Sequence, residues 1–265
     1  MAREVSSITR VGTSEPFELQ VSRGQIAYHE FIHKFGYNPS IEAAAETIWS
    51  EGGLYVYPTS ASTMYISSSS AADTAAGTGA RTATVYGLDA NFEQINVTVS
   101  LNGQTGVQLN GALNWYRVNR IVVNTAGSGG ANAGVLYVGT EATPSGGVPT
   151  NKYATVAIGD NQTLMCLWTV PVGYTAYLHQ KDVSSSSSAG KFAIFTLVSR
   201  PDGGVFNVID RVTLANNATS LSYWNPIVLT EKTDVEVRAI ADSAGGTITV
   251  SATLDITYIK NGDTL

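Results

Sequence analysis

The chain has 265 residues, of which only 14% are charged and 43% are apolar, and its formal net charge is −6. Soluble domains typically carry roughly 25% charged residues, so hydroxyl and amide groups must supply much of the polar surface here. The acidic balance argues against a protein that binds polyanions, because nucleic-acid contacts need clustered Lys and Arg. No basic stripe with interleaved aromatic residues occurs, and no nucleic-acid partner is expected.

The first residues, the hydropathy and the single cysteine predict a protein made in a reducing cytoplasm. Residues 1–7 lack the apolar core of a secretion signal, so no signal peptide is expected. No apolar run approaches the roughly 18 residues of a membrane helix, and no membrane span is expected. The single cysteine, Cys166, lies in an apolar run. We expect it to be a buried thiol that packs as a small hydrophobe.

Residues 1–52 differ from the rest of the chain by their concentration of charge and by two of the three histidines. An extended segment is expected from Pro16. The stretch 41–50 contains good helix formers at helical spacing, which would place Ile48 and Trp49 near one face. These features predict an N-terminal arm that contains one short helix and lies on a partner.

From residue 53 onward, alternating apolar and hydroxyl side chains predict β-strands. Turn signals such as Asn-Gly and Pro-Asp-Gly-Gly separate them at intervals of mostly about 8–12 residues, as in an antiparallel sandwich. The predicted fold is all-β, an antiparallel β-sandwich or jelly-roll-like body. Two stacked β-domains, 53–155 and 156–265, and one continuous body over 53–265 agree equally well with the sequence. The clearest expected strands are 82–89, 94–101, 235–240 and 246–259.

Few groups in the strand-rich region could carry catalysis. Its carboxylates lie mostly beside Gly, Asn or Pro in expected turns, where such side chains usually bind their own backbone. His179 is the one histidine there, and no Gly-x-Ser-x-Gly motif opens a helix. His29 and His33 would align only on a helix, and nothing in the pattern completes a zinc site. We expect no enzyme, no cofactor, and no catalytic, cofactor-binding or metal-binding residues.

Aromatic side chains form the most suggestive set of candidate binding residues. Trp115, Tyr116, Tyr223 and Trp224 lie in or beside expected strands. Exposed, they could stack on sugar rings or form an interface; buried, they belong to the core. A core or subunit-interface position is favoured over a sugar site. Alternation along its strand places Trp168 inside.

Two stretches of the first half have a distinctive sequence. One is SSSSAADTAAGTGARTATVYGLDANF at 67–92, with its continuation through VSLNGQT at 99–105. The other contains VSRG at 21–24, FGYNP at 35–39 and ETIW at 46–49. Both stretches resemble segments of structural proteins from the virions of tailed bacteriophages. The resemblance brings no catalytic residues with it.

The resemblance implies a virion component of the capsid-decoration, head-fibre or tail-accessory type. We expect a homotrimer in the virion, whose arm binds the major capsid protein or a connector or tail protein. Deleting residues 1–52 is then expected to leave folded β-domains that no longer join particles. The alternative is a tail-associated adhesin for a host receptor or carbohydrate, and a virion-bound glycan depolymerase is least favoured. The residues expected to make the attachment are Phe31, Phe35, Tyr37, Ile48 and Trp49.

Overall fold

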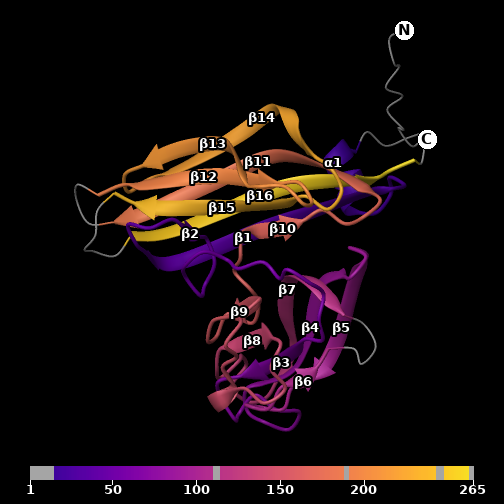
Figure 1. The fold of residues 1–265 in the computed structure, drawn as a ribbon, viewed down its shortest axis with the longest axis vertical. Helices are drawn as coiled ribbons and strands as arrows, with labels where there is room; N and C mark the ends of the chain where they lie inside the picture. Colours follow the sequence, from indigo (N-terminus) through magenta and orange to yellow (C-terminus); the bar gives the residue numbers. More distant parts are fainter. Residues whose placement is uncertain (1–14, 110–113, 188–190, 243–247, 263–265) are drawn as a thin grey trace.

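The computed structural model describes residues 15–109, 114–187, 191–242 and 248–262, and it consists of two stacked β-lobes (Figure 1). Residues 29–49 and 166–262 form a sandwich of long strands. The residues between these two ranges form the other lobe, which we call the inserted lobe. Every strand pair within the described residues is antiparallel, which confirms the predicted all-β fold.

The sandwich is made of two sheets, which we name after one strand of each. The β1 sheet contains, in order, β1 (His29–Ile41), β16 (Ile248–Lys260), β11 (Tyr174–Ser187) and β14 (Ala218–Leu229). The β15 sheet contains β10 (Leu167–Thr169), β15 (Asp234–Ala241), β12 (Ala193–Arg200) and β13 (Asn207–Leu214), and β2 (Glu46–Thr47) also pairs with β15.

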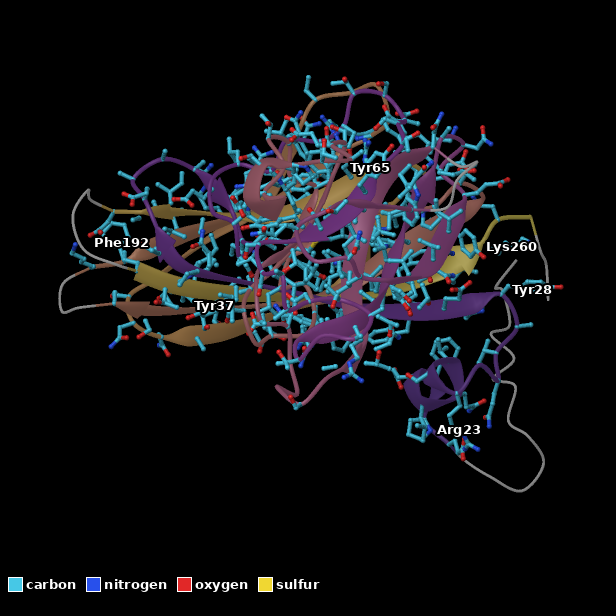
Figure 2. The ribbon with its side chains drawn as sticks, turned by 90° about the horizontal axis from the view of Figure 1, so that it is seen from below. Arg23, Tyr28, Tyr37, Tyr65, Phe192 and Lys260 are labelled. Carbon is cyan, nitrogen blue, oxygen red and sulfur yellow. The ribbon has the colours of Figure 1, made fainter. Side chains whose placement is uncertain are left out.

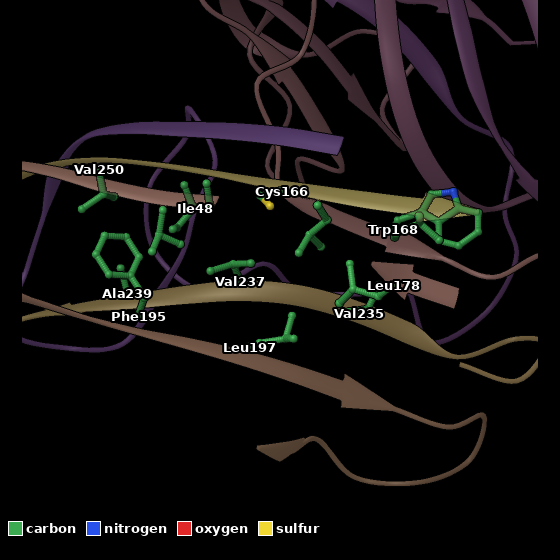
Figure 3. Packing of buried hydrophobic residues seen from close by; sticks show 14 of the residues in the cluster. Ile48, Cys166, Trp168, Leu178, Phe195, Leu197, Val235, Val237, Ala239 and Val250 are labelled. Carbon is green, nitrogen blue, oxygen red and sulfur yellow. The ribbon is translucent and has the colours of Figure 1, made fainter. Parts of the chain in front are cut away.

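Apolar side chains from both sheets of the sandwich meet in one core (Figure 3). Phe195, Leu197 and Val237 come from the β15 sheet and are fully buried. Trp168 is also buried, as its position in an alternating segment predicted. Burying side chains of this size stabilises the fold by about 1.5–3 kcal/mol each, so this core is the main source of stability for the sandwich.

The inserted lobe contains two smaller sheets that pack around a second core. This core includes Met64, Ile66, Val85 and Ile121. One sheet contains, in order, β6 (Val107–Gln108), β3 (Tyr65–Ser68), β8 (Leu136–Gly139) and β9 (Ala154–Val156). The other contains β5 (Gln94–Ser100), β4 (Ala80–Asp89) and β7 (Trp115–Ala126), and the short 3-10 helix η1 spans Ser145–Gly147.

The described part of residues 1–52 is not a separate arm. Strand β1 pairs with β16 along most of its length, from His29 opposite Ile259 to Ile41 opposite Ile248. Ile41, at the end of β1, and Ile48, just after β2, lie in the sandwich core. The expected division was an arm over 1–52 followed by two successive β-domains. In the observed arrangement β1 instead forms the edge of the sheet that contains β16, β11 and β14.

The short helix lies at a different position from the one expected. Helix α1 spans Phe17–Ser22, directly after Pro16, where an extended segment was expected. Proline fits the start of a helix because it has no backbone N–H to satisfy there. The stretch 41–50 forms β2 and turns instead, because the Ile48 backbone bonds to Val237 and Cys166. Tertiary pairing overrides helix propensity at this position.

Cys166 is fully buried, as expected for a structural thiol. Burial raises the pKa of the Cys166 thiol to about 12, although Lys34 and Lys181 partly oppose this shift. Only the thiolate is nucleophilic, so the folded protein should not react with a thiol reagent such as DTNB at pH 8. The urea-unfolded chain should react rapidly and release one equivalent of thiolate dye. Equal rates in the folded and unfolded states would contradict this result.

Candidate functional site

The outer face of the β1 sheet, which points away from the sandwich core, carries a column of aromatic and histidine side chains. Alternate residues of β1 point to this face, and they include Phe31, His33, Phe35 and Tyr37. Phe31 is 45% exposed and Tyr37 is 40% exposed. The structure thus brings together three of the five residues expected to make an attachment.

An apolar row crosses this face from one edge of the β1 sheet to the other. Phe31 lies opposite Thr257, which lies opposite Tyr177, which in turn lies opposite Val228. Val228 is 59% exposed, although it belongs to a strand that also supplies the buried Leu229. Through Thr257 and Tyr177 the row joins the aromatic column on β1 to the opposite edge strand, β14, and we call this row the band.

Helix α1 lies over one end of this face and leaves a hollow beneath it. The Phe17 ring contacts the His29 ring edge-on, with 5.7 Å between their centroids. Figure 2 shows the helix, marked by Arg23, set to one side of the strands near Tyr28, where β1 begins. The hollow has a volume of about 450 Å³, and its lining includes Phe17, Val21, Phe31, His179, Gln180, Ser222 and Asp255.

Trp224 projects from a bulge in the edge strand β14, close to the hollow. The pairing between β11 and β14 skips from Leu178 opposite Ile227 to Gln180 opposite Ser222. One residue of β11 therefore faces four residues of β14, and such bulges bend a strand and redirect its side chains. Trp224 lies in this bulge and is 98% exposed.

The neighbouring Tyr223 points the other way, into a polar cluster between the sheets. Its hydroxyl donates a hydrogen bond to Asp210, which also forms an ion pair with the fully buried Lys181. Burial, together with the nearby Asp210 carboxylate, raises the pKa of the Tyr223 hydroxyl well above its usual range. This cluster anchors the start of the bulge, so Trp224 is held away from the sandwich.

Two of the five residues expected to make the attachment do not lie on the outer face. Ile48 and Trp49 are buried in the two cores, so they do not join Phe31, Phe35 and Tyr37 on the outer face. Trp115 is fully buried in the inserted lobe. The Tyr223 hydroxyl donates its hydrogen bond to Asp210. Sequence reasoning missed Val228 and set His179 aside as a lone histidine. Their place on this face, like that of Tyr177, depends on a register that only the folded chain reveals.

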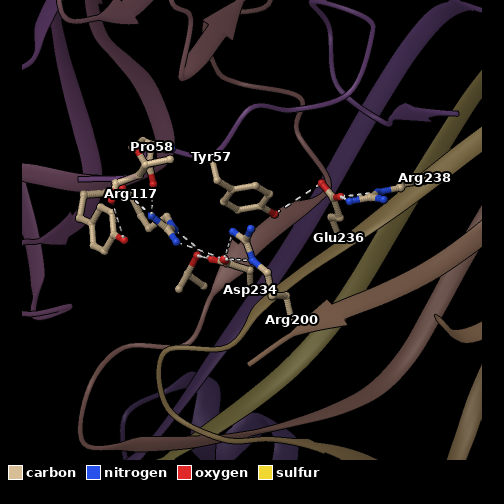
Figure 4. Close-up of polar contacts among 10 residues, drawn as sticks. Tyr57, Pro58, Arg117, Arg200, Asp234, Glu236 and Arg238 are labelled. Atoms are coloured by element: carbon tan, nitrogen blue, oxygen red, sulfur yellow. Dashed lines mark hydrogen bonds and ion pairs between the residues drawn. The ribbon is translucent and has the colours of Figure 1, made fainter. Parts of the chain in front are cut away.

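A network of ion pairs connects the inserted lobe to the sandwich (Figure 4). Arg117 of β7 donates two hydrogen bonds to Asp234 of β15, at 2.9 and 3.1 Å. Arg200 of β12 binds the same carboxylate, and Thr169 donates a further hydrogen bond to it. The predicted aromatic Tyr116 lies beside this network, with its ring centroid 4.2 Å from the Arg117 guanidinium carbon.

A second carboxylate of the same network, Glu236, is buried beside Tyr57. Burial raises the pKa of the Glu236 carboxyl, and Arg238 and Thr47 oppose the shift. Glu236 accepts hydrogen bonds from Thr47 and Tyr57 and pairs with Arg238. Asp234 and Glu236 thus accept hydrogen bonds from side chains of the protein itself, and the network connects the two lobes.

Turn carboxylates bind backbone amides, as the structural interpretation of the sequence predicted. Asp73 is fully buried and accepts hydrogen bonds from the amides of Ala80, Ala133 and Gly134. Asp89 accepts from two amides of its own hairpin. Within residues 15–109, 114–187, 191–242 and 248–262, no three His, Cys, Asp or Glu side chains are grouped to hold a metal ion. Within those ranges no helix has the length and apolarity to cross a bilayer.

Comparison with known proteins identifies no relative by sequence: no protein-family model matches the chain, and no curated protein matches it. Among solved structures, a match to infectious bursal disease virus Gx strain has 12% identity and a TM-score of 0.25, covering 89% of this chain and 73% of that chain. A match to the VP2 subviral particle of the same virus has 12% identity and a TM-score of 0.25, covering 90% and 73%. TM-scores this low do not indicate a shared overall fold.

Proposed function

We propose that the chain is a non-enzymatic structural protein of a virus particle, which attaches to the particle through the outer face of the β1 sheet. It is a capsid-decoration or head-fibre-like component of a tailed bacteriophage, displayed as a homotrimer. The attachment residues are Phe31, Phe35 and Tyr37, with Trp224 added from β14. The partner is the major capsid protein or a connector or tail protein.

The observation that carries this proposal is the 98% exposure of Trp224 next to an apolar band. Tryptophan buries about 150–250 Å² when it is covered, and it is enriched among the residues that dominate interface energies. Covering Trp224 with a partner would remove its apolar area from water, which favours binding. The β-branched and hydroxyl-rich sheets supply a rigid body that holds the band flat.

Trp224→Ser is expected to reduce incorporation of the chain into purified particles by at least about tenfold, because it removes an interface anchor. Incorporation is measured as the particle-bound fraction on immunoblots. Stability should not change, because the side chain is already exposed. Val205→Ser is the matched control, since Val205 is 73% exposed and lies outside the β1 sheet. Normal incorporation of Trp224→Ser would contradict the proposed attachment face.

The oligomeric state is checked separately by light scattering of the purified chain. A mass three times 27.9 kDa supports the homotrimer. An electron-microscopy map of the intact particle then gives the position and copy number. Density for this chain at the tail tip, with Trp224 facing outward, would favour the alternative of a receptor-binding or carbohydrate-binding adhesin.

A further inference from the structure

A cavity of about 400 Å³ lies between the sandwich and the inserted lobe, and it shares Phe35 with the proposed attachment face. Its walls come from β1 and β10 of the sandwich and from β4, β5 and β7 of the inserted lobe. Ligand pockets in proteins commonly have volumes of about 300–1,000 Å³. The cavity is therefore large enough for a small organic molecule.

Lys34, which lines this cavity, is a buried cation that lacks a carboxylate partner. It is only 5% exposed, and its ammonium group donates a hydrogen bond of 2.6 Å to the backbone oxygen of Asn119. No ion pair formed within the described residues includes it. Two other buried cations do have a carboxylate partner: Lys181 pairs with Asp210, and Arg117 pairs with Asp234. Leaving a buried charge unpaired is costly, so an anion that enters the cavity would stabilise the protonated form of Lys34 without competing against a carboxylate of the protein.

The rest of the lining reinforces the positive character of the cavity. Arg120 adds a second cation, and no Asp or Glu is among the described residues that line it. Two buried polar atoms on lining residues, Asn119 Oδ1 and Arg120 Nε, have no hydrogen-bond partner within the described part of the chain. Buried polar groups are normally satisfied, so these two atoms also favour a bound polar ligand.

We propose that this cavity binds a carboxylate-bearing sugar, with its carboxylate on Lys34 and Arg120. Aromatic rings and side-chain amides complete the chemistry that a sugar needs. Tyr86 is 41% exposed and lines the cavity together with Phe35 and Asn96. Rings cover the apolar face of a pyranose, and amides bind its hydroxyls. A site for a simple inorganic anion would not need these rings.

The charge state of Lys34 makes the expected binding pH-dependent. Burial is the main cause that lowers the pKa of the Lys34 ammonium to about 7; Cys166 opposes this shift, and Arg120 adds a smaller lowering contribution. A carboxylate binds the protonated lysine best, so affinity should fall by about tenfold between pH 6 and pH 8. His33 also lines the cavity, and it is paired with Asp255. A His33→Gln variant separates the two groups, because it should keep the pH dependence.

The test is titration of the full chain with D-glucuronate, followed by calorimetry at pH 6. We expect a Kd on the order of 1 mM or tighter, and at least about tenfold weaker binding of D-glucose, which lacks the carboxylate. Lys34→Met keeps the side-chain volume and removes the charge, and it should weaken glucuronate binding by about tenfold or more. Lys152→Met is the matched control, since Lys152 pairs with Glu51 outside the cavity. Thermal unfolding confirms that each variant is folded.

Three results would overturn the proposal. Glucuronate could bind no better than glucose, which would remove the role of the carboxylate. Lys34→Met, folded by thermal unfolding, could bind glucuronate as tightly as the natural chain, which would remove the role of Lys34. Acetate or sulfate could bind as tightly as glucuronate, which would make the cavity a general anion site with no sugar recognition.

Discussion

Deletion of residues 1–52 is expected to abolish folding of the sandwich rather than to release soluble β-domains. The deletion removes β1 and with it the partner of β16. It also removes Ile41 and Ile48 from the core and leaves the backbone of β16 unpaired on one side. Losing two core side chains of this size alone costs about 4–10 kcal/mol, which is comparable to the whole stability of a typical domain. Circular dichroism and size-exclusion chromatography measure the outcome.

A shorter deletion, of residues 1–24, is the control for this experiment. It removes α1 but ends before β1, so the sandwich strands remain. This variant should stay monodisperse and retain its β-signal. If the 1–52 deletion also gave a soluble, cooperatively folded chain, the contribution of β1 to the sandwich would be wrong.

Asp234→Asn is expected to destabilise the chain by about 3–5 kcal/mol, because it leaves two guanidinium groups without a counter-ion. The Arg117 side chain is only 6% exposed and depends on Asp234 for charge neutralisation. The asparagine keeps the shape of the aspartate but provides one acceptor oxygen in place of two. Urea unfolding followed by tryptophan fluorescence measures the change.

The exposed Asp202→Asn in the adjacent loop is the matched control for Asp234. It also removes one negative charge near the Arg200 and Arg117 side chains, but it is part of no ion pair within the described residues. Its unfolding midpoint should remain unchanged. An equal shift in both variants would mean that long-range charge, not the buried network, sets the stability.

Local patterns were sufficient to predict much of the β-structure. Alternation predicted strands at 82–89 and 94–101, and the turn between them lies at 90–93 as expected. The strand expected over 246–259 is β16, although its first two residues lie outside the described ones. These successes rest on neighbours in sequence, because side-chain alternation is a local property of a strand.

Long-range pairing could not be predicted in the same way. His29 lies opposite Ile259, and nothing near either residue specifies the other. The charged residues and the glycine of 29–41 led to the prediction of an arm. In the structure this stretch is an edge strand, β1, which pairs with β16. The candidate site shows the same limit. Phe31, Phe35 and Tyr37 are separated by even numbers of residues, so alternation alone places them on one face. Val228 lies on the same face, but two strands, β16 and β11, lie between it and β1.

The pairing of the first long strand with the last one also determines when the fold can form during synthesis. β1 leaves the ribosome before the whole inserted lobe, and its partner β16 follows that lobe. The inserted lobe, whose strands are all contained between them, can close much sooner. Non-local pairing is slow because a long loop must close before any contact forms. The nascent chain must therefore hold an unpaired edge strand until β16 has been made. Glu30, Lys34 and Pro39 of β1 are features that discourage pairing with other chains during this time.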